Sequence, residues 1–299
     1  MSSSARTAAL ATAALAFNAF IWGVSWYPFR LLHEAGLHPV WSTVLIFTVA
    51  LAALLAARPA AAQALRMPPL WLLALATGLT NMGFNWSVTI GDVVRVVLLF
   101  YLMPAWAVLL AWWLLRERPT RAALLRLALA FAGVVIVMLP LGGREAPAPA
   151  ADTPWLADGL ALAGGFCFAL TNVLLKRLAR VPDTHRMAAM FGGGVVFSAL
   201  AGLAGLATGR IAPPPAPALG WLAVAGVLAL CFLASNYALQ YGAARLPSGT
   251  TSVVMLTEVV FASASSIALG AAAPSLRTLV GGMLVVLAAV LAALDSRGR

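Results

Sequence analysis

The chain has 299 residues, of which 63% are hydrophobic and 9% are charged. A soluble domain carries about a quarter charged residues, so this chain lacks the polar surface that a globular protein in water needs. Its apolar stretches recur at about 20 residues, the length of helix that crosses the hydrocarbon core of a bilayer. The composition therefore predicts an all-α integral membrane protein and excludes an ordinary soluble one.

The net charge is +10, from 19 basic and 9 acidic residues. No cluster of Lys and Arg alternates with aromatic residues on a polar surface, as a nucleic-acid groove would require. Basic residues of membrane proteins gather instead in cytoplasmic loops. We therefore expect the lipid bilayer as a partner, and no nucleic acid.

Apolar runs between charged, proline and glycine residues predict ten transmembrane helices. The first five lie at 8–29, 39–57, 69–90, 93–115 and 122–142, and the second five at 155–176, 187–207, 218–241, 248–270 and 275–294. A Pro- and Ala-rich stretch separates the two sets. We expect a first five-helix repeat at 1–142, a periplasmic linker at 143–154 and a second repeat at 155–299.

The basic residues are distributed unevenly between the two sides. Ten spans place both termini on one side, and 14 of the 19 basic residues fall there. The other five lie opposite: Arg30, Arg95, Arg144, Arg210 and Arg277. The positive-inside rule then predicts that both termini are cytoplasmic.

Short matching stretches recur in the same order in the two halves. The matches are 20–26 with 166–172 at a shift of 146, Asn85-Trp86 with Asn236-Tyr237 at a shift of 151, and Pro119 with Pro274 at a shift of 155. Because five is odd, a tandem copy of a five-helix unit enters the membrane the opposite way round. An inverted repeat is typical of transporters that bind substrate near mid-bilayer and work by alternating access.

Three motifs carry a family resemblance: Trp22-Gly23, the stretch from Leu102 to Thr120 that contains Pro104, and Gly133 in the fifth helix. These residues resemble the drug/metabolite transporter (DMT) superfamily, specifically its EamA-type ten-helix members. The resemblance covers essentially the whole chain, with loose motifs. It implies an alternating-access membrane transporter.

Within that superfamily, Tyr101 to Pro104 and the aromatic first and sixth helices are most similar to the bacterial aromatic amino-acid exporter. This implies export of aromatic and other amphipathic amino acids and related small metabolites across a bacterial inner membrane. The second half departs from the family pattern, with Ala272 in place of a loop glutamate and Glu258-Val259 where a proline often follows. The missing proline predicts a helix at 248–270 that is straighter than the one at 93–115.

Glu258 lies eleven residues into its predicted span and is the only acid placed so near the bilayer centre. A charged group there is costly, so it should face the bundle interior or a wet cavity. Two roles are open. Glu258 either binds a substrate ammonium group or exchanges a coupling proton, or it is a structural group hydrogen-bonded to another helix.

Other candidates for substrate binding are aromatic and amide side chains on the predicted first, third, fourth, sixth and eighth helices. They are Asn18, Trp22, Asn81, Asn85, Tyr101, Met103, Phe168, Asn172 and Tyr237, with Pro104 as a gating hinge. We expect Trp22 and Phe168 to flank one cavity from opposite halves. Aromatic stripes also serve plain helix packing, and amides also form interhelical hydrogen bonds, so both alternatives stay open.

An intramembrane enzyme would need a nucleophile with a base, or a metal cluster, at depth. The three histidines, His33, His38 and His185, are expected in loops. We therefore predict neither an enzyme nor a metal or cofactor site. Alternatives within transport are a quaternary-amine or multidrug exporter of the same fold and a channel-like facilitator. A monomer is the expectation, and coupling to protons is left open.

Overall fold

The computed structural model describes residues 3–90, 99–116, 118–138, 154–269 and 276–297. Every regular element within them is a helix, which confirms the predicted all-α class. In chain order the elements are α1 (Ser3–Val24), α2 (Trp26–Glu34), α3 (Pro39–Ala57), the 3₁₀ helix η1 (Pro59–Arg66), α4 (Pro68–Ile90), α6 (Met103–Leu115), α7 (Arg121–Met138), α8 (Pro154–Arg177), α9 (Asp183–Ala207), α10 (Leu219–Ala243), α11 (Ser248–Met255), α12 (Thr257–Ala268) and α13 (Leu276–Arg297).

The described helices account for the ten predicted spans. Five stretches are long and apolar enough to cross a membrane, and three shorter apolar helices fall in the predicted fourth, ninth and tenth spans. Helices α1 and α2 share the first span, and α11 and α12 share the ninth. Residues 91–98 of the loop and fourth span, and the linker at 143–153, lie outside the described residues.

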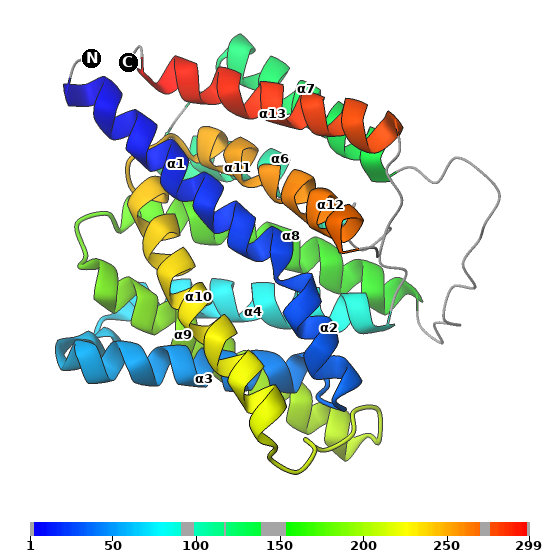
Figure 1. Ribbon diagram of the computed structural model, residues 1–299. Helices are drawn as coiled ribbons and strands as arrows, with labels where there is room; N and C mark the ends of the chain where they lie inside the picture. Colours follow the sequence, from blue (N-terminus) through cyan, green and yellow to red (C-terminus); the bar gives the residue numbers. More distant parts are fainter. Residues whose placement is uncertain (1–2, 91–98, 117, 139–153, 270–275, 298–299) are drawn as a thin grey trace.

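The two halves are intertwined in a reciprocal way. Helix α1, the first of its half, packs on α10 and α12 of the other half, and α8, the first of the second half, packs on α4 and α6. The two fifth helices, α7 and α13, pair at one edge of the bundle, while α3 and α9 pair at the opposite edge (Figure 1). Equivalent helices therefore make equivalent contacts, as an inverted repeat requires.

Individual contacts obey the same relationship. Asn18 of α1 donates a hydrogen bond of 3.0 Å to the carbonyl oxygen of Ser235 in α10. The repeat alignment makes these two residues equivalent to a second pair. Asn18 corresponds to Gly164 at the shift of 146, and Ser235 corresponds to Phe84 at the shift of 151. A Cβ placed on Gly164 would lie 3.3 Å from the backbone nitrogen of Phe84, so the equivalent positions of α8 and α4 also meet.

The helix predicted at 248–270 is broken rather than straight, whereas residues 93–98 of the span with which it was compared lie outside the described residues. Leu256 separates α11 from α12, with φ −61° and ψ −16°, and the amide of Val259 bonds to the carbonyl of Leu256 at 3.1 Å. The hydroxyl of Thr257 donates to the carbonyl of Val254 at 2.7 Å. A hydroxyl that competes for a backbone carbonyl bends a helix without any proline.

The same local geometry occurs in the first half. Leu102, 154 residues before Leu256, has φ −69° and ψ −6° at the start of α6, where Pro104 lies in the first turn. Between α1 and α2, the Ser25 hydroxyl donates to the carbonyl of Trp22 at 2.7 Å. Breaks in the first, fourth and ninth spans therefore lie beside residues that the sequence nominates for the site.

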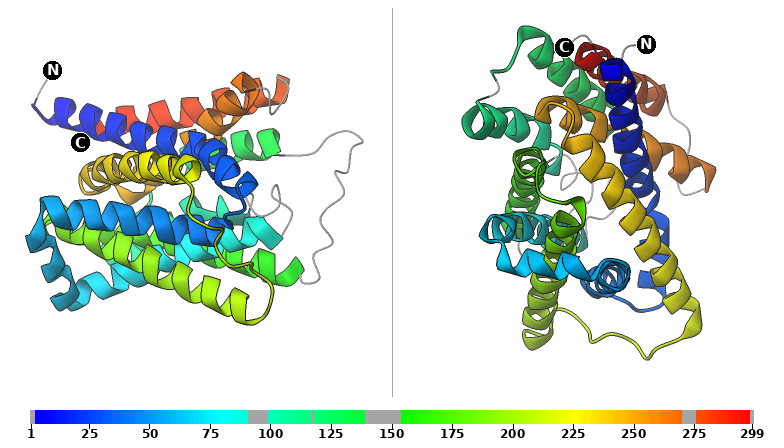
Figure 2. Two further views of the ribbon diagram at one scale, coloured as in Figure 1. Left: turned by 60° about the horizontal axis from the view of Figure 1, so that its bottom comes forward. Right: turned by 90° about the vertical axis from the view of Figure 1, so that its left-hand side faces the viewer.

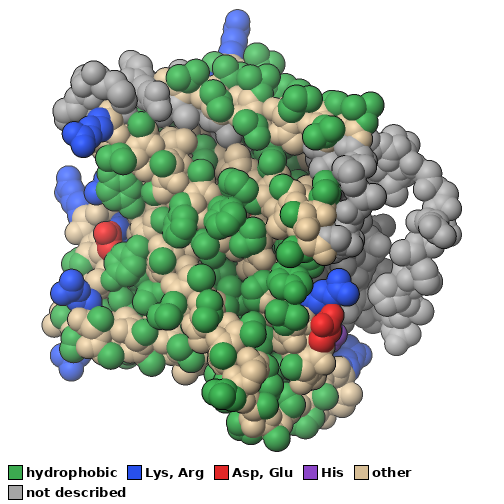
Figure 3. Space-filling view, in the orientation of Figure 1, with side chains coloured by type: hydrophobic (Ala, Val, Ile, Leu, Met, Phe, Trp, Pro, Cys, Tyr) green, Lys and Arg blue, Asp and Glu red, His purple; other side chains and the backbone are tan. Residues whose placement is uncertain are grey.

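The two ends of the chain lie at the same end of the bundle, where α1 begins and α13 ends (Figure 2). Most of the basic side chains visible in Figure 3 gather along that end, and hydrophobic side chains cover the flank between the two ends. Trp112 and Trp113 of α6 are 56% and 76% exposed. Exposed apolar side chains such as these are suited to contact with lipid rather than water.

Two residues expected in loops lie instead in the first turn of α9. His185 and Arg186 are both buried. The Arg186 guanidinium donates to the carbonyls of Leu175 and Leu178 at 3.2 and 3.1 Å and pairs with Asp183. Because α8 ends at Arg177, the Leu175 carbonyl in its last turn has no amide partner from a further turn, and Arg186 supplies a donor to it. The Leu178 carbonyl, just beyond the helix, also accepts the amide of Val181 at 2.9 Å. His33, also expected in a loop, lies in the last turn of α2.

Candidate substrate site

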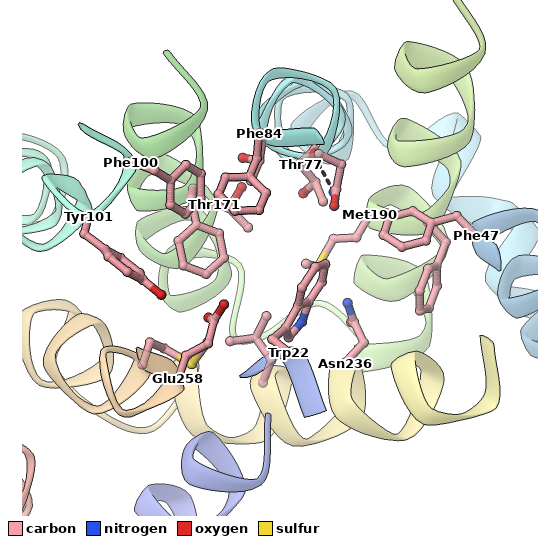
Figure 4. Close-up of a pocket in the computed structure, with 16 residues that line it drawn as sticks. Trp22, Phe47, Thr77, Phe84, Phe100, Tyr101, Thr171, Met190, Asn236 and Glu258 are labelled. Atoms are coloured by element: carbon pink, nitrogen blue, oxygen red, sulfur yellow. Dashed lines mark hydrogen bonds between the residues drawn. The ribbon is translucent and has the colours of Figure 1, made fainter. Parts of the chain in front are cut away.

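A cavity of about 70 Å³ lies between the two halves (Figure 4). Every span except the fifth and the tenth contributes to its wall. Its lining residues are Trp22, Phe47, Thr77, Thr80, Asn81, Phe84, Phe100, Tyr101, Phe168, Thr171, Met190, Phe191, Asn236, Leu239, Met255 and Glu258. Both halves therefore build the site, as expected for an inverted repeat.

Five of the predicted site residues line this cavity: Trp22, Asn81, Tyr101, Phe168 and Glu258. They lie on α1, α4, α8 and α12 and just before α6. The side chains of Tyr101 and Glu258 point toward one another at the cavity edge (Figure 4). Residues far apart in the sequence thus share one wall.

Aromatic rings form two groups around the cavity. The Trp22 ring stacks on Phe232, with centroids 4.5 Å apart and planes at 19°. On α8, Phe168 packs against Phe100 at 5.9 Å, and Phe100 packs against Phe84 at 4.7 Å. Trp22 and Phe168, which the repeat alignment makes equivalent, therefore belong to separate aromatic groups, one from the first helix of each half.

Two of the predicted amides are engaged in helix packing outside the lining. Asn18 bonds to both the carbonyl and the hydroxyl of Ser235, and Asn85 donates to the hydroxyl of Thr43. These contacts correspond to the interhelical hydrogen bonds that were the alternative interpretation of both residues. Their predicted contact with substrate does not fit this cavity.

Three further candidates also lie outside the lining. Met103 is 1% exposed within the core, and Tyr237 is 39% exposed on the outer side of α10. Asn172 is 1% exposed, and neither polar atom of its amide has a hydrogen-bond partner among the described residues. Pro104 lies in the first turn of α6, so its backbone is next to the Tyr101 and Leu102 turn.

The sequence reasoning missed most of the polar side chains on α4. Thr77, Thr80, Asn81 and Phe84 all line the cavity, and their spacing of three, four and seven residues defines one face of a helix. That stripe is visible in the sequence. Asn236 also lines the cavity, whereas its neighbour Tyr237 does not.

The threonines present only hydrogen-bond acceptors to the cavity. The hydroxyls of Thr77, Thr80 and Thr171 donate to carbonyls of their own helices at 2.9, 2.8 and 2.9 Å. Each hydroxyl has one proton, and once that proton is donated the oxygen can only accept, through its two lone pairs. Asn81 likewise uses one amide proton on the carbonyl of Thr77 at 2.8 Å.

Glu258 is the single charged side chain among the described lining residues. No hydrogen bond or ion pair links its carboxylate to another part of the described chain. Taken with the threonine oxygens, the carboxylate makes the cavity rich in acceptors, while the side chains of Trp22, Tyr101 and Asn81 carry donors. Elsewhere among the described residues, no three His, Cys, Asp or Glu side chains come together as a metal site would require.

A membrane-spanning bundle of two intertwined halves around a central cavity defines the class of inverted-repeat transporters. The chain belongs to the EamA-like transporter family, whose profile matches residues 9–139 and 155–294, once in each half. It is therefore a multi-pass membrane transporter of the drug/metabolite type.

A solved structure described as a crystal structure of a protein has a similar fold, with a TM-score of 0.78 and 22% sequence identity. The similarity covers 96% of this chain and 98% of that one, and at this identity it supports the fold alone. No curated protein matches the chain.

Proposed function

We propose that this transporter exports small amphipathic molecules that carry a primary ammonium group, foremost aromatic and other apolar amino acids. The observation that carries the proposal is the acceptor-rich aromatic cavity with Glu258 as the one charge among its described lining residues. An ammonium group offers three N–H donors and a positive charge. It complements both the carboxylate and the threonine oxygens.

The aromatic rings suit the rest of such a molecule. An apolar side chain gains about 25 cal/mol for each Å² that it removes from water, and Trp22, Phe84 and Phe100 offer apolar surface. The faces of these rings also attract a cation by about 0.5–2 kcal/mol. A molecule with an ammonium head and an apolar body therefore satisfies both parts of the cavity.

A quaternary amine fits the same cavity less completely. Its positive charge complements Glu258 and the aromatic faces, but it has no N–H group to donate. The hydroxyl oxygens of Thr77, Thr80 and Thr171, residues that line the cavity, would then lose water without gaining a donor, and unmatched polar groups lower affinity. The geometry thus favours primary over quaternary ammonium.

The membrane and direction of transport are also proposals. The uneven distribution of basic residues supports cytoplasmic termini, and the sequence resemblance supports a bacterial inner membrane and export. A proton exchanged at Glu258 and facilitated diffusion down a cytoplasmic gradient are both compatible with this site.

The test is uptake by purified protein in liposomes, with L-phenylalanine, L-leucine, phenethylamine and N,N,N-trimethylphenethylammonium as labelled substrates. We expect saturable uptake of the first three compounds. The KM of the quaternary compound should be at least tenfold higher. Transport of the quaternary compound alone would contradict the proposal. Uptake that rises linearly with concentration would indicate the channel-like facilitator instead.

A further inference from the structure

One amide of the cavity wall has its orientation fixed by the side chain beside it. Asn236 of α10 accepts a hydrogen bond at Oδ1 from Nε2 of Gln240, at 3.3 Å. Its Nδ2 makes no hydrogen bond within the described part of the chain. Figure 4 shows this nitrogen directed toward the cavity, with Trp22 between it and Glu258 in that view. Asn236 therefore offers a donor to whatever occupies the cavity.

The orientation of the Asn236 amide depends on Gln240, which is fully buried. Nε2 of Gln240 also contacts Sδ of Met190 at 2.9 Å. A thioether sulfur can accept a hydrogen bond but cannot donate one, so the NH₂ end of Gln240 must face Met190. Its Oε1 has no hydrogen-bond partner among the described residues, and the contacts of Nε2 alone set the orientation of the amide.

The donor or acceptor role of each group then fixes the role of the next. Met190 accepts, so Gln240 donates, and Asn236 turns its oxygen toward Gln240 and its NH₂ toward the cavity. A reversed Gln240 amide would place Oε1 against Sδ of Met190, two acceptors in contact, even if the Asn236 amide reversed with it. A carboxylate on the substrate accepts hydrogen bonds, so it would complement the N–H donors of Asn236.

We propose that Asn236 recognises the substrate carboxylate and that Gln240 is the positioning residue that turns Asn236 into a donor. This inference rests on the proposed function and narrows its substrate class. Glu258 recognises the ammonium group that amines and amino acids share. Asn236 distinguishes an α-amino acid from the amine that lacks the carboxylate.

The experiment compares L-phenylalanine with phenethylamine, which differ only in the carboxylate. Liposome transport is measured for the unmodified protein and for Gln240→Met, which keeps the length of the side chain but removes the donor. We expect KM for L-phenylalanine to rise about tenfold, the effect of losing one hydrogen bond to a charged group. KM for phenethylamine should change less than about twofold.

Two further variants protect the test against misfolding of Gln240→Met. Met190→Leu conserves volume, removes the acceptor and should reduce the preference for the amino acid in the same direction. Asn236→Asp replaces the donor with an acceptor and should reverse the preference, so that phenethylamine becomes the better substrate. Gln63→Met, at an exposed position of η1, is the matched control and should change neither KM.

A merely structural role for Gln240 would move both KM values together, and that result would overturn the inference while leaving the proposed function intact. Unchanged KM values for both substrates in Gln240→Met and Met190→Leu would also overturn it. If the unmodified protein transports neither compound, the proposed function fails and this inference fails with it.

Discussion

Gly23 of α1 lies directly against the backbone of Glu258, the residue that supplies the carboxylate of the cavity. A Cβ placed on Gly23 would stand 2.7 Å from the carbonyl oxygen of Glu258 and 2.8 Å from Cβ of Phe261. Real Cβ atoms do not approach backbone so closely, so no larger residue fits without moving α12. Helix α1 thus contributes Trp22 to the cavity wall and, through Gly23, also positions the residue that carries the carboxylate.

Gly23→Ala should displace α12 and lower both stability and transport. We expect a loss of about 1–3 kcal/mol in the free energy of unfolding, the usual cost of overpacking, together with a raised KM for amino acids. Thermal unfolding in detergent and liposome transport measure the two effects. Gly226→Ala in α10 is the control, because a Cβ there meets nothing within 4 Å. Equal behaviour of the two variants would contradict the proposed role of this contact.

Glu258→Gln should weaken transport while stabilising the fold. The amide keeps the shape of the side chain but loses the charge-assisted hydrogen bond to ammonium, so we expect affinity to fall at least tenfold, about 1.4 kcal/mol or more. An unpaired carboxylate in an apolar interior costs free energy, and its removal should raise the thermal midpoint. Glu34→Gln, at an exposed pair with Arg30, should do neither. Normal transport by Glu258→Gln would reduce Glu258 to a structural group.

Asn18→Leu should destabilise the packing of α1 on α10 without changing substrate preference. Asn18 bonds to the carbonyl and hydroxyl of Ser235, and an interhelical hydrogen bond in a membrane protein contributes about 0.6–2 kcal/mol. A double-mutant cycle with Ser235→Ala isolates the side-chain part. If Asn18→Leu altered the ratio of KM values for L-phenylalanine and phenethylamine, the original prediction that Asn18 binds substrate would be restored.

Arg186→Met should lower the free energy of unfolding by about 2–4 kcal/mol. The guanidinium is buried and bonded to the carbonyls of Leu175 and Leu178, and removing it leaves the Leu175 carbonyl and Asp183 without that donor. Arg180→Met, an exposed position in the same connection, should cost little. Similar thermal midpoints for the two variants would show that the buried contacts of Arg186 contribute nothing.

His38 should make stability depend on pH outside the membrane-spanning segments. Its Nδ1 accepts the amide of Val40 at 3.2 Å and caps α3. Burial, together with the nearby His33, lowers the pKa of His38 below its usual 6.5. The unfolded chain then binds a proton more readily than the folded one, so stability is full above about pH 6.5 and falls as the pH drops below it.

His38→Asn keeps an acceptor at the helix cap but cannot titrate. Its thermal midpoint should therefore fall less than that of the unmodified protein between pH 8 and pH 5. The two midpoints are compared by differential scanning fluorimetry in the same detergent. Parallel pH profiles would exclude His38 as the source of the dependence.

The membrane architecture could be predicted from the sequence because its signals are local. A stretch of about 20 apolar residues partitions into lipid whatever its neighbours are, and basic residues remain outside the hydrocarbon core. The inversion follows from the odd number of helices in each repeat. The shifts of 146 and 151 residues also relate two contacts in the structure, that of Asn18 with Ser235 and that of Gly164 with Phe84.

Only the tertiary structure decided which face of each helix lines the cavity. Neighbouring residues of a helix differ by about 100° in direction, which separates Asn236 on the cavity wall from Tyr237 on the exposed side. In lipid both the buried and the outer face of a helix are apolar, so hydrophobic periodicity carries little information about rotation. Polar residues are ambiguous for the same reason: Asn81 lines the site and Asn18 joins two helices, although both are amides at membrane depth.

The sequence by itself therefore determined how many helices cross the membrane and how the halves are related. Only packing between the halves decided which side chains share the cavity, and which hydrogen bonds turn those side chains into donors or acceptors.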